Sequence, residues 1–173
     1  MSTIKKIIKR LIILLVNLFV FILSLVIPKN DKFIIVGGWF GKRFADNSKH
    51  LFLYTNDNKN KLNIDKIIWV TRSKSIKEEL QKNGFMAYNV WSLPSVWYHL
   101  RAKYHIVDQS PLDVNSFLSV RSKRINLWHG FPMKKIGTYM NSGKTNYNNG
   151  FLKLINKLTT RGCWGDHYLL ATS

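Results

Sequence analysis

The sequence predicts an α/β fold, a Rossmann-like parallel sheet with helices on both faces, preceded by a hydrophobic N-terminal membrane helix. Short apolar runs alternate with amphipathic segments, which is the pattern of a parallel sheet covered on both faces. One long apolar segment precedes this alternation. We therefore expect a membrane-anchoring helix with a basic flank at residues 1–29 and a Rossmann-like domain at residues 30–173.

The N-terminal apolar segment runs from Leu11 to Pro28 without a charge. At about 1.5 Å per residue it reaches roughly 27 Å, close to the hydrocarbon thickness of a bilayer. Its apolar residues lie all round the helix, which favours insertion, and a poor cleavage site after it argues against a signal peptide. Basic residues flank it on both sides, so a span and a shallow insertion with both ends cytoplasmic both stay open. The same cations would attract the anionic lipids of the cytoplasmic membrane.

Local signals place the remaining elements in order. Apolar runs predict strands at 32–37, 66–70, 85–88, 104–108, 124–128 and 168–171. Helices are expected at 47–54, 75–83, 92–102 and 151–158. Ser75 with Glu78 forms a capping box for the second of these helices, and Gly84 ends it. Ligands of such sheets bind beyond the carboxyl ends of the strands, so the loops after Gly37, Val70, Asp108 and Trp128 are the places to look.

Composition limits the function classes. The chain has 173 residues, and 27 lysines and arginines against 9 aspartates and glutamates give a formal net charge of +18. This length excludes a large two-domain enzyme within the chain. The charge predicts an anionic partner, which could be nucleic acid, acidic lipid or a phosphorylated substrate. The single cysteine and the scattered histidines lack metal-ligand spacing, so we expect no metal and no cofactor.

The richest motif follows the strand expected at 124–128. His129 stands directly after this strand, Gly130 permits close approach, and Lys134 and Lys135 lie a few residues further on. Imidazole can take a proton from a hydroxyl while cations offset phosphoryl charge, so the pattern suits a general base beside a phosphate site. The alternative is a loop histidine with ordinary partners and two solvated lysines.

A second motif follows the first strand. Its glycines, aromatic residues and cations include Gly41 and Lys42, and Asp46 and Asn47 then begin a helix whose free N–H groups can hold an anion. Binding of an acceptor phosphate is one interpretation. A glycine-rich turn with ordinary N-capping is the other. Elsewhere, we expect Trp91, Trp97 and Tyr98 to pack a helix.

The segment LWHGFPMKKIG at 127–137 resembles the W-H-G-T-P-L-K-K motif of the CDP-glycerol (or CDP-ribitol) phosphotransferases that build teichoic acids and capsular polymers. The stretch GGWFGKRFADNSK at 37–49 is similar to the F-G-K-x-Y-x-D-N-x-K segment of the same family. The resemblance covers roughly residues 29–173. Phe131 stands where the family usually has threonine, so one hydroxyl contact is lost, and Met133 replaces leucine.

The resemblance implies one half of a GT-B-like enzyme with two Rossmann-like domains. The amino-terminal half would carry the acceptor side, and the chain would end before the half that binds the CDP-alcohol. His129 would be the catalytic base. Phosphate would be bound by a group of residues from both motifs: Gly130, Lys134, Lys135, Gly41, Lys42, Asp46 and Asn47. The enzyme would transfer glycerol phosphate or ribitol phosphate to a hydroxyl of a membrane-linked polymer and release CMP.

Because CDP-linked donors are cytosolic, the resemblance places the globular part on the cytoplasmic face of the cell membrane. The expected partners are CDP-glycerol or CDP-ribitol, a polyanionic lipid-linked polymer acceptor and the lipids of the cytoplasmic membrane. No recognised nucleic-acid-binding motif occurs, so nucleic acid is not an expected partner. The competing function is a non-enzymatic, membrane-tethered basic module that binds polyanions.

Overall fold

The computed structural model describes residues 3–128 and 168–169 of the chain. Within them, strands form one six-stranded sheet in the order β3-β2-β1-β4-β5-β6. Every pairing in this sheet is parallel. The order is that of a Rossmann fold, in which the chain moves outward from β1 first to one side and then to the other. The predicted fold class is therefore confirmed in its parallel α/β architecture.

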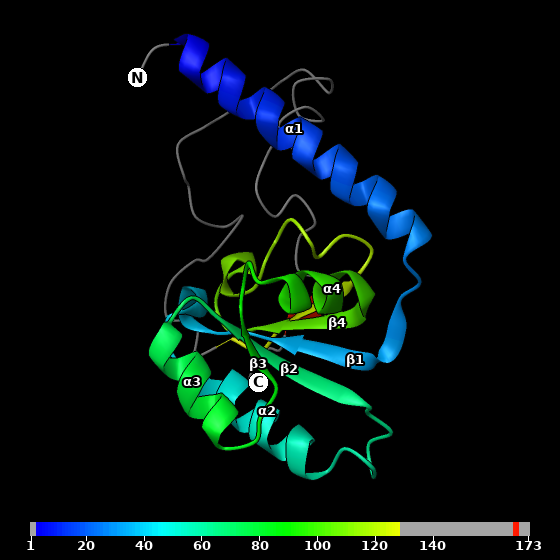
Figure 1. Ribbon diagram of the computed structural model, residues 1–173, viewed down its shortest axis with the longest axis vertical. Helices are drawn as coiled ribbons and strands as arrows, with labels where there is room; N and C mark the ends of the chain where they lie inside the picture. The colour runs from blue at the N-terminus through cyan, green and yellow to red at the C-terminus, as the bar shows by residue number, and fades with distance from the viewer. Residues whose placement is uncertain (1–2, 129–167, 170–173) are drawn as a thin grey trace.

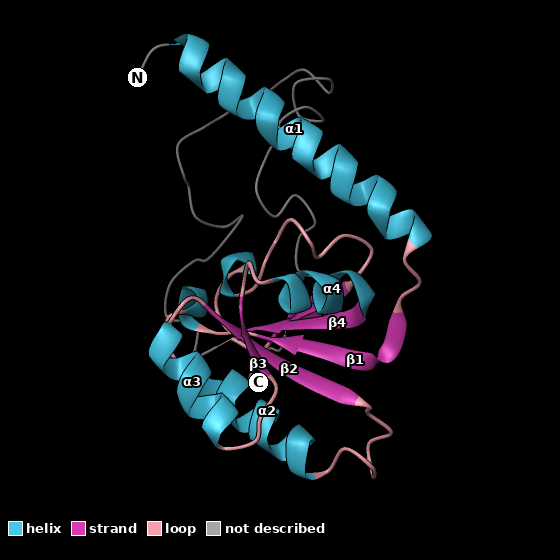
Figure 2. Ribbon diagram, viewed as in Figure 1, coloured by secondary structure: helices cyan, strands magenta, loops and turns pink. Residues whose placement is uncertain are grey.

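The elements follow one another in the alternation expected from the sequence (Figure 2). The strands are β1 Asn30–Val36, β2 Lys66–Thr71, β3 Ala87–Asn89, β4 Ala102–Val107, β5 Lys123–Asn126 and β6 Tyr168–Leu169. The helices are α1 Thr3–Val26, α2 Asp46–Asp57, α3 Lys74–Lys82 and α4 Leu93–Arg101, with short 3-10 helices η1 Trp39–Gly41 and η2 Pro111–Asp113. Figure 1 shows α2 and α3 on one side of the sheet and α4 on the other.

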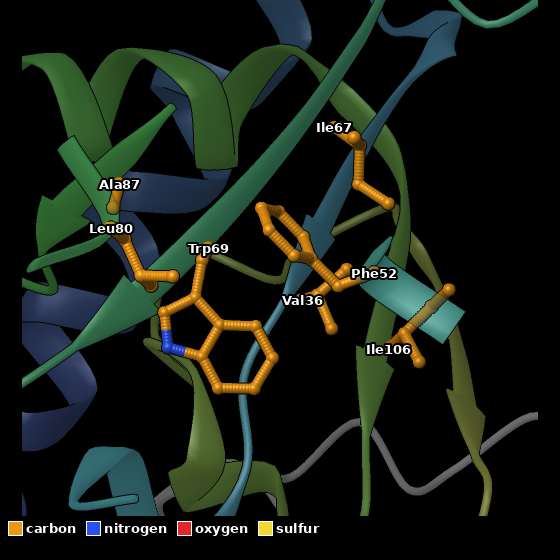
Figure 3. Close-up of a cluster of buried hydrophobic side chains, with 7 residues drawn as sticks. All are labelled: Val36, Phe52, Ile67, Trp69, Leu80, Ala87 and Ile106. Carbon is orange, nitrogen blue, oxygen red and sulfur yellow. The ribbon is translucent and has the colours of Figure 1, made fainter. Parts of the chain in front are cut away.

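The face of the sheet under α2 and α3 is packed with aromatic side chains. Phe52 of α2 and Trp69 of β2 are fully buried, with ring centroids 5.6 Å apart and steeply inclined planes. Phe44 packs edge-on against Trp69 at 4.7 Å. Figure 3 shows the buried cluster of Val36, Phe52, Ile67, Trp69, Leu80, Ala87 and Ile106. Side chains alternate along each strand, so the neighbouring residues Ile35, Ile68 and Val70 face the other side.

The α4 face has a polar network within it. His99 of α4 and His105 of β4 are both fully buried, and their rings meet edge-on at 5.2 Å. The backbone N–H of Asn115 donates to His99 Nε2 at 3.1 Å, and His105 Nδ1 lies 2.8 Å from Ser119 Oγ. Lys29, just before β1, donates to Ser122 Oγ at 2.8 Å at the border of this network. The network ties the connection between β4 and β5 to α4.

Helix α1 meets the body of the protein near its C-terminal end. Val20 is buried with Leu100 of α4 and with Leu118 and Val120, and Arg121 donates to the carbonyl oxygen of Ser24. Most of the large apolar side chains described on α1 are exposed. Among residues 3–128 and 168–169, we find no helix that combines the length and the apolar character needed to pass through a bilayer. A helix is present at Thr3–Val26, but the membrane helix predicted from the sequence is unsupported.

The element boundaries correct several local predictions. Helix α2 begins at Asp46, one residue earlier than expected. Its N-cap is Ala45, whose side chain makes no capping hydrogen bond. The N-cap of α3 is Ser73, which accepts from the N–H of Ile76, so the capping box predicted at Ser75 is wrong. Strand β3 begins at Ala87 rather than at residue 85. The helix expected at 151–158 lies outside the described residues.

Candidate functional site

The candidate site lies at the carboxyl edge of the sheet, where β1 lies between β2 and β4. The direction of strand addition reverses around β1, and such a reversal is where ligands of open α/β sheets bind. Gly37 and Gly38 carry the chain out of β1, and the N–H of Gly37 still donates to Ile106 of β4 at 3.1 Å. A Cβ on Gly38 would lie 2.6 Å from Ser48 Oγ and 3.0 Å from Asp108 Oδ2. Only glycine therefore fits here, because the start of α2 and the end of β4 press against the backbone.

Asp113 organises the loop that follows β4. Its carboxylate is fully buried. Oδ2 accepts the backbone N–H groups of Asp108, Gln109 and Ser110 at 3.0, 2.8 and 3.2 Å. Oδ1 accepts the N–H of Phe40 at 2.7 Å. One side chain therefore fastens the loop after β4 to the loop after β1.

Asp108, the residue after β4, fixes the start of α2. Its Oδ1 accepts the backbone N–H of Ser48 at 2.9 Å, and its Oδ2 accepts the Ser48 hydroxyl at 2.5 Å. The pKa of Asp108 is raised to about 6, mainly by burial. The two bonds from Ser48 lower this pKa, and the nearby carboxylates of Asp113 and Asp46 raise it. Both oxygens are engaged by Ser48, so Asp108 here holds a helix start in place.

Arg72, directly after β2, links the loop after β1 to the loop after β4. Its Nη1 donates to the carbonyl oxygens of Phe40 at 2.7 Å and Leu112 at 2.8 Å. Partial burial lowers the pKa of Arg72, and Asp113 opposes this shift. Gly41 has φ +73, and its carbonyl accepts the hydroxyl of Thr71 at 2.8 Å. The cation thus serves as a brace between the loops after β1 and β4.

The start of α2 touches the chain that leaves β5. Asn47 Nδ2 donates to the carbonyl oxygen of Trp128 at 2.5 Å, across 81 positions of sequence. Its neighbour Asp46 accepts the indole N–H of Trp39 at 2.5 Å, and Arg43 stacks over that indole at 4.7 Å. The two sequence motifs therefore meet at the same edge of the sheet, through the first turn of one helix.

Unusual backbone conformations gather around this edge. Four of the six non-glycine residues described with positive φ are here: Trp39 at 49°, Phe40 at 54°, Asp46 at 57° and Trp128 at 55°. Such conformations cost about 1–3 kcal/mol each and persist where the surroundings enforce them. They are more frequent at functional sites than elsewhere, which favours this edge as the functional site.

The predicted site residues divide into two groups. Gly41, Lys42, Asp46 and Asn47 lie together in the loop after β1 and the first turn of α2, with Lys42 exposed beside Arg43. His129, Gly130, Lys134 and Lys135 lie outside the described residues, and their roles stay predictions. Within the described ranges no group of three or more histidine, cysteine or acidic side chains is placed to hold a metal ion.

Sequence reasoning missed the residues that build the edge. The bonds that hold the loops of this edge together are made by Asp113, Arg72 and Ser48. Asp108 was expected only as the last residue of a strand. A signal for Asp113 exists, because Ser110-Pro111-Leu112-Asp113 has the spacing of a capping box, and the structure forms that box. Arg72 carries no comparable pattern, since its partners are backbone carbonyls distant in sequence.

The model of the CDP-glycerol:poly(glycerophosphate) glycerophosphotransferase family matches residues 19–173. The chain belongs to this family. It is 29% identical over 154 residues to the teichoic acid poly(glycerol phosphate) polymerase of Bacillus spizizenii (strain ATCC 23059 / NRRL B-14472 / W23), an alignment covering 83% of this chain and 38% of that protein.

A solved structure has a similar fold. A variant of the wall teichoic acid polymerase TagF superposes with a TM-score of 0.51 and 18% identity, covering 82% of this chain and 32% of that one. The chain thus spans roughly a third to two fifths of the relatives that it matches. The likeness supports the parallel α/β architecture.

Proposed function

We propose that this chain is the acceptor-side part of an enzyme that transfers glycerol phosphate, or ribitol phosphate, from a CDP-alcohol to a hydroxyl of a teichoic-acid-type polymer. Membership of the glycerophosphotransferase family supports this reaction class. The matched relative from Bacillus spizizenii is named as a teichoic acid poly(glycerol phosphate) polymerase. The half that binds the CDP-alcohol would lie in the part of the relatives that this chain does not span.

The observation that carries the proposal is the contact between Asn47 and the Trp128 carbonyl. It brings the family's two motifs to one edge, directly before His129 in the chain. That edge is the switch point of the sheet, where a ligand is expected. The exposed cations Lys42 and Arg43 lie in the same loop, where a polyanionic acceptor would find opposite charge.

In this proposal His129 takes the proton of the acceptor hydroxyl. The oxygen then attacks the phosphorus that carries the glycerol, the bond between the two phosphates of the donor breaks, and CMP leaves. Gly130 permits close approach, and Lys134 and Lys135 offset the phosphoryl charge. A positioned general base of this kind contributes about 10²–10⁴-fold to the rate.

We propose that the protein works at the cytoplasmic face of the membrane. Leu15, Phe19 and Leu25 of α1 have more than half of their surface exposed, at 65, 63 and 57%. Trp91, before α4, and Trp97, within α4, are also exposed, at 62 and 49%, so the packing predicted for these two is wrong. Tyr98 does pack, against the buried residues on the α4 face. Tryptophan and leucine beside cations suit the boundary of an anionic bilayer. Ready labelling of Cys163 by an impermeant thiol reagent outside intact cells would contradict this location.

Release of CMP tests the reaction. The chain, expressed with any sequence that follows it in its reading frame, is supplied with CDP-glycerol or CDP-ribitol and membranes carrying acceptor polymer. We expect His129→Ala to reduce CMP release by about 10²–10⁴-fold, and His50→Ala, an exposed histidine of α2, to leave it unchanged. Full activity in His129→Ala removes the assigned base. Absence of CMP release with salt-sensitive binding of unrelated DNA and RNA favours a polyanion-binding module instead.

A further inference from the structure

The two ends of α2 each carry an asparagine whose amide donates to a backbone carbonyl. Asn58, past the C-terminal end, donates to Tyr54 at 2.8 Å, four residues earlier in the same helix. Asn47 donates instead to Trp128 at 2.5 Å, on a segment 81 positions away. Both amides are exposed, so the difference between them lies in the segment to which each is bonded. Asn58 closes its own helix, whereas Asn47 ties the helix to the chain leaving β5.

Residues on both sides of Asn47 are fixed. Asp46 binds the Trp39 indole at 2.5 Å, and Ser48 binds both oxygens of the buried Asp108. Any side chain larger than hydrogen at Gly38 would strike this Ser48–Asp108 pair. The amide of Asn47 therefore projects from a first turn that has little freedom to move.

The chain that Asn47 holds is constrained step by step. The N–H of Leu127 donates to Val107 at 2.8 Å, which continues the pairing of β4 with β5. The N–H of Trp128 donates to Asn126 Oδ1 at 3.0 Å. Trp128 itself has φ 55°, a conformation that needs support from its surroundings. The bond from Asn47 to its carbonyl supplies such support at the last peptide unit before His129.

We propose that Asn47 is a positioning residue, which orients the backbone entering His129 by holding the Trp128 carbonyl against the fixed start of α2. This inference rests on the proposed function in one respect, the role of His129 as the base. It replaces the expected phosphate contact of Asn47 with a structural bond that acts through its neighbour. Because small displacements of a reacting group reduce rates steeply, the bond has a direct consequence for turnover.

Two substitutions separate positioning from folding. Asn47→Asp keeps the size of the side chain and removes the donor, and a carboxylate in the first turn of a helix is favourable to the helix itself. Asn47→Ala removes the contact altogether. Asn58→Ala is the matched control, since it deletes the same kind of amide–carbonyl bond at the other end of α2. Thermal unfolding verifies that each variant folds.

The deciding readout is the imidazole of His129 in the full chain, followed by NMR in detergent micelles and assigned with His129→Ala. We expect Asn47→Asp and Asn47→Ala to move its resonances and titration midpoint, and Asn58→Ala to leave both as in the wild type. Unchanged His129 signals in folded Asn47→Asp overturn the inference, whether or not the protein releases CMP. Wild-type protein that releases no CMP contradicts the proposed function alone, because the imidazole signals still decide the role of Asn47.

Kinetics add a second criterion where CMP release is measurable. A positioning residue lowers kcat, and we expect a loss of about tenfold to hundredfold in Asn47→Asp with little change in KM. A residue that binds the acceptor phosphate raises KM instead, and that outcome overturns the inference. Equal losses in Asn47→Asp and Asn58→Ala would also overturn it, since they would reflect the helix and not the contact.

Discussion

The two faces of the sheet are built on different principles. Under α2 and α3, Phe44, Phe52 and Trp69 interlock with their rings edge to face. Under α4, two fully buried histidines bond to hydroxyl and backbone groups. The aromatic face carries the helix whose first turn forms the candidate site. The polar face fastens the connection from β4 to β5 and lies on the side of α1. We infer that the stability of the face under α4 depends on the protonation of its two buried histidines.

The largest effect is expected from the aromatic face. Trp69→Ala should lower the free energy of unfolding by about 3–5 kcal/mol, because it leaves a large cavity beside Phe44 and Phe52. Val70→Ala, the next residue on the opposite face, should cost less, at about 2 kcal/mol, since fewer atoms are removed. Urea unfolding measures both. Equal losses would contradict a large contribution of Trp69 to the aromatic face.

The second prediction concerns acid and the α4 face. The pKa of His99 is lowered to about 4, mainly by burial. A bond to the Ser95 backbone raises this pKa, and the positive charges of Lys29 and Arg72 lower it. The unfolded chain takes up this proton near pH 6.5 and the folded one only near 4, so stability falls as pH drops between these values. The shift corresponds to about 3 kcal/mol.

His99→Gln tests that origin, because it removes the titrating group and leaves side-chain polarity in place. We expect its stability to vary less than that of the wild type between pH 6.5 and 4, as measured by urea unfolding at each pH. His105 contributes in the same direction, since burial lowers its pKa as well. A pH profile of His99→Gln that matches the wild type would show that His99 is not the group responsible.

The third prediction has the opposite sign at the carboxyl edge. The pKa of Asp108 is raised to about 6, so the folded protein binds its proton more tightly than the unfolded chain, and stability is lost as pH rises through 6. Asp108→Asn cannot ionise and can still accept the N–H of Ser48. Its melting temperature relative to wild type should therefore increase from pH 4 to pH 7. A constant difference over this range would exclude ionisation of Asp108 as the cause.

The smallest effect belongs to the surface. Lys74 and Glu78 of α3 approach to 3.8 Å, and both side chains are largely exposed. Exposed pairs four residues apart on a helix contribute about 0.3–0.5 kcal/mol and are weakened by salt. Lys74→Ala should change the unfolding midpoint only slightly, and less at high salt. A loss comparable to that of Val70→Ala would mean that charge on α3 supports the aromatic face.

The sequence predicts the sheet well because its signal is local. Apolar runs such as KIIWV at 66–70 form strands wherever they can be buried on both faces, and β2 is Lys66–Thr71. Helix caps are less certain, since Ser73 and Ser75 both lie near the start of α3, and the structure has Ser73 as the cap that accepts the N–H of Ile76. Exposed Trp97 shows the same limit, because an apolar residue on a helix does not reveal which side the core will cover.

The motifs of the candidate site can be recognised in the sequence, but the contact between them cannot. Both motifs can be recognised in one sequence, but their meeting depends on the Trp128 carbonyl, and a backbone oxygen has no sequence signature. The positive φ angles of Trp39 and Phe40 are equally hidden, because these residue types seldom adopt them. Contacts distant in sequence hold the backbone of Phe40, whose N–H donates to Asp113 and whose carbonyl oxygen accepts from Arg72.

The most direct test of the proposed acceptor site is a titration of the isotope-labelled chain with a short poly(glycerol phosphate), followed by backbone amide resonances. Our account predicts the largest changes at Gly38, Phe40, Ser48 and Trp128, on the carboxyl edge above the aromatic face. Changes concentrated on α3 or α4, with that edge unaffected, would contradict it.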